Sequence, residues 1–318
     1  MLLDLVYLIG GIALVIFSAN WLVDGASSLA KKYGIPDLVI GLTIVAFGTS
    51  APELTVNLFS ALQGSTAIAI GNVLGSNIAN IFLIVGLSAL ISPLLIQKNT
   101  TWKEIPLSLL AAIVLGFLAN DQLIDNNPIG NFISRIDGLV LLSFFIIFMV
   151  YTIEISKNQS ETDEQVVLMP IWKSILLMVA GLLGLFFGGK FLVEGAVSLA
   201  GQLGMSEKLI GLTIVAVGTS TPELATSLVA AYKKKADIAI GNIVGSNIFN
   251  IFFILGITAL IQPLPFEPSM NFDIAITILA SFLLFMTTIV LGKRKVVKAE
   301  GVVFLLIYIA FIVYSVYR

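Results

Sequence analysis

Two residue types that dominate metal and redox chemistry are missing: the 318-residue chain contains no cysteine and no histidine. Without cysteine there are no disulfides and no thiolate ligands. Without histidine there are no imidazole ligands and no imidazole general bases. Any metal ion that this protein binds must therefore be held by oxygen atoms.

Charge is also scarce, because only 11% of the residues are charged while 58% are hydrophobic. Mean hydropathy is +1.04, and an ordinary soluble domain carries about 25% charged residues. One helical crossing of a membrane needs about 20 apolar residues. We therefore predict an all-α polytopic membrane protein with ten crossings, near 3–23, 36–62, 67–92, 104–120, 137–154, 171–192, 207–231, 236–262, 272–291 and 301–317.

The few basic residues are distributed unevenly between the two predicted membrane faces. Four of the 17 Lys and Arg fall on one face, at Arg135, Lys190, Lys208 and Arg318. The other thirteen fall on the opposite face, which the positive-inside rule makes cytoplasmic. Both termini then lie outside, which agrees with the even number of crossings, because an even number returns the chain to the side where it started.

Two stretches of the sequence occur twice. GLTIVAFGTSAPEL at 41–54 returns as GLTIVAVGTSTPEL at 211–224, and IGNVLGSNIANIF at 70–82 returns as IGNIVGSNIFNIF at 240–252. Each copy belongs to a set of five predicted crossings, and an odd number turns the second set upside down relative to the first. Inverted repeats of this kind are typical of secondary transporters, whose substrate site lies near the midplane where the repeats meet.

The two predicted halves cover 1–155 and 171–318, with five helices each. A short polar segment at 156–170 joins them and carries an acidic run. We interpret it as a solvated cytoplasmic linker, too short to contain a folded regulatory domain.

Glu53 and Glu223 occupy matched positions in the two copies, inside spans apolar enough to cross a bilayer. A carboxylate at bilayer depth is expensive unless it has a partner, so by default it marks an ion or proton site. The matched pair predicts one site built from both halves. The alternative is a buried structural carboxylate bonded to neighbouring backbone.

Other oxygen-bearing side chains surround each glutamate. Two hydroxyls precede it within one helical turn, and the adjacent proline removes a backbone donor and frees carbonyl oxygens. The following crossing adds a hydroxyl and an amide four residues apart on one helix face. The candidate ligands besides the glutamates are Thr49, Ser50, Ser76, Asn80, Thr219, Ser220, Ser246 and Asn250. Asn77 points elsewhere, and we expect it to brace the helix break.

This set of oxygens suits hard cations. Ca²⁺ takes six to eight oxygen ligands, and two glutamates balance its charge, whereas Mg²⁺ gives up its water reluctantly. Na⁺ ions can occupy the same oxygens singly. Because two bare carboxylates are costly to carry across a membrane, we expect the site to exchange only when it is filled, which predicts obligate antiport.

Rival functions stay open at this stage. The nearest is a proton-coupled antiporter of Ca²⁺ or another divalent cation, in which one glutamate alternates between proton and cation. A passive channel fits an inverted repeat less well, and an intramembrane enzyme would need a nucleophile with a base. We therefore expect no enzyme activity, no cofactor besides the transported ions, no nucleic acid and no obligate protein partner.

The doubled motif, G-T-S-x-P-E followed by G-S-N, resembles that of the sodium/calcium exchangers in the cation/calcium exchanger superfamily. The resemblance covers nearly the whole chain and is highly specific. It implies ten helices in two inverted fives, and Na⁺ influx that drives electrogenic Ca²⁺ extrusion by alternating access. It also implies a prokaryotic type, resident in the cell's inner membrane.

The resemblance also assigns roles by position. Glu53 and Glu223 would bind Ca²⁺ and Na⁺ directly, while Thr49 and Thr219 would offer backbone carbonyls. Ser50, Ser76, Ser220 and Ser246 would serve Na⁺, and Ala46 and Ala216 would add carbonyls at outer Na⁺ positions.

The chain departs from the family in two respects. Several relatives carry Asp where Asn250 stands, whereas here Asn80 and Asn250 are both neutral. This weakens a K⁺-coupled reading and leaves the stoichiometry open. The linker also lacks the large Ca²⁺-sensing region of the animal exchangers.

Overall fold

A computed structural model describes residues 2–64, 66–124, 130–157, 167–202, 216–290 and 294–317. Within these residues eight helices are long and apolar enough to cross a membrane, and a ninth span results if the bent pair Asp37–Thr49 and Ala51–Leu62 is counted as one. The seventh predicted crossing, 207–231, lies partly outside the described residues, as does much of the predicted linker. The predicted number of ten therefore stays a prediction, while a mostly helical membrane architecture is confirmed.

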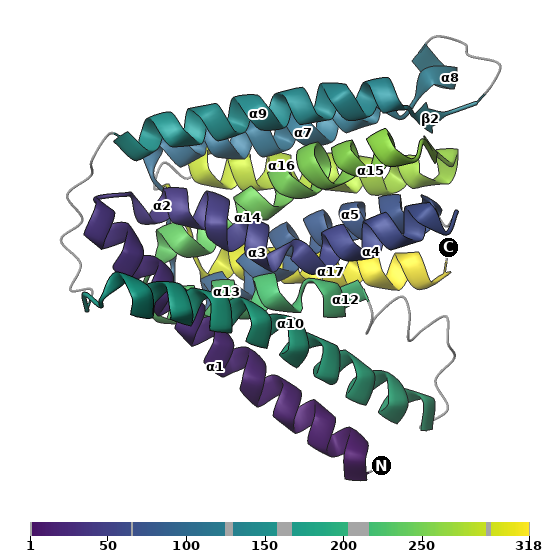
Figure 1. Ribbon diagram of the computed structural model, residues 1–318. Coiled ribbons are helices and arrows are strands. Elements are labelled where there is room, and N and C mark those ends of the chain that lie inside the picture. The colour runs from purple at the N-terminus through teal and green to yellow at the C-terminus, as the bar shows by residue number, and fades with distance from the viewer. Residues whose placement is uncertain are drawn as a thin grey trace.

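Two long helices lie side by side and run away from the remaining helices (Figure 1). They are α1 (Leu2–Tyr33) and α10 (Ile171–Gln202). Both continue about three turns beyond the predicted ends at 23 and 192, because no proline or left-handed glycine interrupts α1 before Gly34. Glycines allow the two backbones to touch: a Cβ on Gly11 would lie 2.7 Å from the backbone nitrogen of Leu192.

The second span is interrupted. It consists of α2 (Asp37–Ile40), a π-helical turn η1 (Gly41–Val45), α3 (Ala46–Thr49) and α4 (Ala51–Leu62), with a bend of 44° between α3 and α4. The corresponding elements of the second half are α12 (Ala216–Thr219) and α13 (Thr221–Tyr232).

Two further spans form the centre of the molecule. One is α5 (Thr66–Ile78), η2 (Ala79–Val85) and α6 (Gly86–Ile91), and the other is α14 (Ala236–Ile248), η5 (Phe249–Leu255) and α15 (Gly256–Ile261). They are the most buried spans described, at 72% and 83% of their apolar windows. Their middle segments η2 and η5 are π-helical, which the sequence did not predict and which is frequent at functional sites.

The peripheral spans cover this centre. They are η3 (Thr100–Glu104) with α7 (Ile105–Leu118), α9 (Arg135–Lys157), η6 (Pro268–Met270) with α16 (Asn271–Val290), and α17 (Lys298–Tyr317). A short helix α8 (Asp121–Ile124) lies at one end. The start of α1 and the end of α17 lie toward the same end of the helices in Figure 1.

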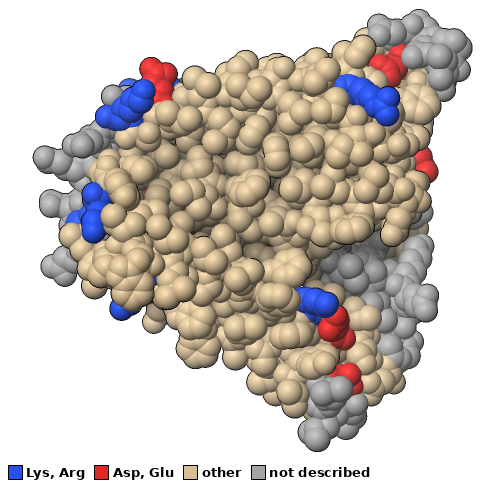
Figure 2. Space-filling view, in the orientation of Figure 1, with Lys and Arg blue, Asp and Glu red and all other residues tan. Residues whose placement is uncertain are grey.

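Two short antiparallel strand pairs close the ends of the bundle. Strand β1 (Leu94–Leu95) pairs with β4 (Lys295–Val296), and β2 (Phe132–Ile133) pairs with β3 (Leu264–Pro265). Between the two ends, Figure 2 shows a broad uncharged area, with most Lys, Arg, Asp and Glu toward its edges. An uncharged band of this kind is what a surface in contact with lipid requires.

Candidate cation site

The two glutamates lie in the first turn of a helix that starts at a break. Ser50 has φ −83° and ψ 6°, and Ser220 has φ −83° and ψ 8°. The backbone therefore departs from helical geometry at the same position in both repeats. Proline follows within the first turn of α4 and of α13, where its missing N–H does no harm. Glu53 and Glu223 are thereby held at helix N-termini, whose partial positive charge favours a carboxylate.

Both glutamate side chains are fully inside the protein, with 0% of Glu53 and 1% of Glu223 exposed. The hydroxyl of Ser50 donates to Oε1 of Glu223 at 2.9 Å, and the hydroxyl of Ser220 lies 3.4 Å from Oε1 of Glu53. Each carboxylate therefore takes a hydroxyl from the opposite half of the chain. Ser76 adds a second hydroxyl to Oε1 of Glu53, at 3.3 Å.

The second oxygen of each carboxylate has no hydrogen-bond partner within the described ranges. Several buried oxygens of predicted ligands lack hydrogen bonds among the described residues, namely Oε2 of Glu53, Oε2 of Glu223, Oδ1 of Asn80, Oδ1 of Asn250 and Oγ of Ser246. A buried polar atom left unsatisfied costs about 1–3 kcal/mol, and more when it is charged. An oxygen-seeking cation would satisfy such atoms, whereas more apolar packing would not.

A frame of four amides joins the central spans beside the glutamates. Asn80 donates to Oδ1 of Asn247 at 2.9 Å, and Asn250 donates to Oδ1 of Asn77 at 3.0 Å. Asn77 and Asn247 also donate to each other's backbone carbonyls, at 3.2 and 3.4 Å. Asn77 thus braces the contact between halves rather than the helix break. The Oδ1 atoms of Asn80 and Asn250 accept no hydrogen bond from the described residues.

Two further amides belong to the site and were not among the predicted ligands. Asn242 lies 3.0 Å from the hydroxyl of Thr49 and donates to the backbone carbonyl of Glu223 at 3.3 Å. Its repeat mate Asn72 accepts from the hydroxyl of Thr219 at 3.4 Å. Both follow a glycine in the repeated I-G-N string, so an amide duplicated inside an apolar span was the available signal.

The predicted backbone ligands are placed less directly. The carbonyl oxygen of Ala46 accepts the N–H of Ser50 at 3.0 Å and lies 3.3 Å from the hydroxyl of Thr49. To bind an ion, it would have to exchange one of these donors. Ala216, the repeat mate of Ala46, is the first residue of α12. Its role as a carbonyl ligand stays a prediction.

Acidic groups are sparse elsewhere in the interior. Among the residues that the structure describes, no three Asp, Glu, His or Cys side chains gather closely enough to hold a metal ion. The site is instead a pair of carboxylates in a shell of hydroxyl and amide oxygens. This composition can neutralise one divalent cation or accommodate monovalent cations singly.

Sequence comparison identifies the family. The profile of the sodium/calcium exchanger proteins matches residues 3–154 and 173–317. The chain belongs to this family. Its members are transporters rather than enzymes, and the present chain is accordingly an integral membrane antiporter for Ca²⁺ and a counter-cation.

Individual relatives agree along nearly their whole length. The putative antiporter CaxA of Alkalimonas amylolytica is 39% identical, with 98% of each chain covered. The sodium/calcium exchanger MaX1 of Methanosarcina acetivorans is 32% identical over 100% of this chain and 97% of its own. A structure of the sodium-calcium exchanger NCX_Mj soaked with Na⁺ and Ca²⁺ has a TM-score of 0.83 at 34% identity and 98% coverage of both chains.

Proposed function

We propose that this exchanger couples Na⁺ entry to Ca²⁺ extrusion by alternating access, and that Glu53 and Glu223 bind both ions. The observation that carries the proposal is the free, buried Oε2 atom on each glutamate, beside the free oxygens of Asn80, Asn250 and Ser246. Two buried carboxylates, each with one oxygen that accepts no hydrogen bond from the described residues, favour cationic cargo. Ca²⁺ supplies the matching charge of two.

Sodium is the favoured counter-ion because the shell is rich in neutral oxygens. A proton needs only one carboxylate oxygen, whereas Na⁺ needs several ligands around it. Ser50, Ser76 and Ser220 already contact the glutamates, and Ser246 has a free hydroxyl. The supporting ligands in our proposal are these four serines, Thr49, Thr219, Asn80 and Asn250, with carbonyls of Ala46 and Ala216.

The pattern of contacts supports two inverted halves, 1–155 and 171–318, as the unit of alternating access. Ser50 bonds to Glu223 as Ser220 bonds to Glu53, and Asn80 bonds to Asn247 as Asn250 bonds to Asn77. Such reciprocity is what a pseudo-two-fold axis through the site produces. Termini outside and basic loops in the cytoplasm of a prokaryotic inner membrane complete the proposal.

The coupling ion can be tested in proteoliposomes that contain the purified full chain. Vesicles loaded with Na⁺ should take up ⁴⁵Ca²⁺ from a Na⁺-free medium, and a pH gradient imposed without Na⁺ should drive no uptake. If the pH gradient drives uptake and the Na⁺ gradient does not, the proton-coupled alternative replaces this one.

A further inference from the structure

A cavity lies away from the glutamates, at the end of the bundle where β1 and β4 pair. Its volume is about 290 Å³, near the lower limit of about 300 Å³ for small-molecule sites. Pro93, Leu94 and Ala231 give it apolar walls, and two lysines, Lys234 and Lys295, line it from different segments. Lys234 belongs to the turn between α13 and α14, whereas Lys295 begins β4.

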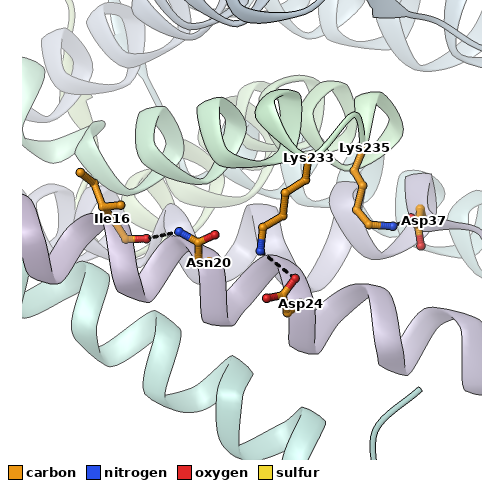
Figure 3. Close-up of polar contacts among 6 residues, drawn as sticks. All are labelled: Ile16, Asn20, Asp24, Asp37, Lys233 and Lys235. Carbon is orange, nitrogen blue, oxygen red and sulfur yellow. Dashed lines mark hydrogen bonds and ion pairs between the residues drawn. The ribbon is translucent and has the colours of Figure 1, made fainter. Parts of the chain in front are cut away.

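The neighbours of Lys234 in this turn are already paired. Lys233 contacts Asp24 of α1 at 2.7 Å, and Lys235 contacts Asp37 of α2 at 3.4 Å (Figure 3). Across the described residues, by contrast, neither Lys234 nor Lys295 takes part in any ion pair. The two cationic side chains that line the cavity therefore have no anionic partner in the described part of the chain.

The internal repeat shows that the fold does not require lysine at these places. Lys234 corresponds to Gly64, and both residues adopt a left-handed backbone, with φ +59° and +78°. Glycine accepts this conformation freely, whereas a residue with a Cβ is strained in it. Lysine therefore occupies a glycine position against its conformational preference.

Lys295 also has no lysine at the corresponding position of the other strand pair. Lys295 pairs with Leu95 in β1, and the repeat mate of Leu95 is Pro265, which pairs with Phe132. The same strand pairing thus carries a phenylalanine at one end and a lysine at the other. Both lysines fall on the face that the sequence predicts to be cytoplasmic.

The surroundings of the cavity have the composition of a membrane interface. Leu95, which lines it, is 64% exposed, and Tyr232, next to the lysine turn, is 78% exposed. Exposed apolar and aromatic side chains beside lysines are typical of the headgroup level of a bilayer. A ligand here would need an anionic group for the lysines and an apolar body for the walls and rim.

We propose that this cavity binds an anionic phospholipid of the cytoplasmic leaflet, with its phosphate between Lys234 and Lys295 and its glycerol and upper acyl chains against the apolar wall. Basic pockets between transmembrane helices on this side are known to suit such headgroups. The proposal does not depend on which ions the central site carries.

Native mass spectrometry of the full-length chain in detergent tests the proposal, with phosphatidylglycerol and phosphatidylcholine of identical acyl chains as probes. The unaltered chain should prefer phosphatidylglycerol by roughly 30-fold, the contribution of two interfacial lysines. The double variant Lys234→Gly with Lys295→Gln should lose this preference. A control with the same charge change on exposed lysines of the same predicted face, Lys32→Gln with Lys157→Gln, should keep it.

Stability measurements separate lost binding from lost folding. Lys234→Gly should unfold at the same or a higher temperature, because glycine fits the left-handed turn, and Lys295→Gln alone gives a second variant that leaves this turn intact. Equal lipid preference in the unaltered chain and the double variant would overturn the proposal. Calorimetric titration with inorganic phosphate should give no binding. If phosphate binds as tightly as phosphatidylglycerol, the cavity is a site for free anions and the phospholipid proposal is overturned.

Discussion

At the scale of single residues, the two glutamates are each half satisfied. One oxygen of each carboxylate accepts a serine hydroxyl from the other half of the chain, and the other oxygen has no donor among the described residues. A fully hydrogen-bonded carboxylate would have no reason to bind a cation. The unsatisfied oxygens leave both carboxylates available to a cation.

Replacing either glutamate by glutamine should therefore abolish exchange. Glu53→Gln or Glu223→Gln keeps the shape but removes one of the two charges that balance Ca²⁺, and we expect Na⁺-dependent ⁴⁵Ca²⁺ uptake to fall by roughly 100-fold or more. Glu194→Gln is the control, because that side chain is 48% exposed and pairs with Lys190 at the surface. Normal uptake in Glu53→Gln or Glu223→Gln would remove that residue from the site.

Asn242 and Asn72 offer a second test, because they are repeat mates with different surroundings. Asn242 is fully buried and supports Thr49, Ser227 and the backbone of Glu223, whereas Asn72 is partly buried and makes longer bonds, of 3.2 and 3.4 Å. Asn242→Ala should lower the free energy of unfolding by about 1–3 kcal/mol, and Asn72→Ala by less. Thermal unfolding in detergent measures both. A loss for Asn72→Ala equal to or above that for Asn242→Ala would contradict this account of the site.

At the scale of elements, α1 and α10 form a unit that packs against the second span. Val15, Ala19, Leu22, Met178 and Leu185 of this unit share a small core with Ile40 and Val45 of the second span, while Val23 of α1 belongs to the large core around α5 and α14. Close contacts at glycines hold this unit together.

The glycine contact between these helices has a matched control next to it. A Cβ on Gly11 would meet backbone atoms of α10 at 2.7 to 3.0 Å, whereas no described atom lies within 4 Å of one on Gly10. Gly11→Ala should destabilise the protein by about 1–3 kcal/mol through overpacking. Gly10→Ala should be neutral or stabilising by up to about 1 kcal/mol, because alanine favours a helix. Equal unfolding temperatures for the two variants would refute the close contact.

At the scale of the whole molecule, residues at matching positions in the two halves make different contacts. The repeated motifs meet at the centre with reciprocal hydrogen bonds, yet Ser76 bonds to Glu53 while its mate Ser246 is free. The turn at 233–235 forms ion pairs with α1 and α2, through Lys233 and Lys235. The repeat mates of Lys233 and Lys234 are Gln63 and Gly64, which carry no charge. The two ends of the transport path are therefore chemically distinct, although the sequence motifs are nearly identical.

The proposed exchange moves net charge if more than two Na⁺ leave for each Ca²⁺ that enters a vesicle. A membrane potential clamped positive inside should then accelerate ⁴⁵Ca²⁺ uptake into Na⁺-loaded vesicles, and one clamped negative inside should slow it. We expect a severalfold difference, since about 2.3 kcal/mol acts on one elementary charge per 100 mV. Uptake that is indifferent to the potential would show electroneutral exchange and contradict electrogenic extrusion.

Several features of this protein are determined by the sequence alone. Apolar runs, glutamates inside those runs and an internal repeat can all be recognised in the sequence. The helical membrane architecture, the paired glutamates and their serine neighbours can therefore be predicted without coordinates. The breaks at Ser50 and Ser220 follow from the adjacent prolines, which act within one turn of helix.

Other features depend on which segments meet in space. Thr49 and Asn242 are 193 positions apart, and Asn77 and Asn250 are 173 positions apart, so no local pattern indicates that these side chains contact one another. The close approach of the α1 and α10 backbones depends on their mutual packing, and the basic cavity depends on the pairing of β1 with β4. A sequence records which groups are present and how far apart they are along the chain; the tertiary structure decides which polar groups find partners and which remain free to bind an ion or a lipid.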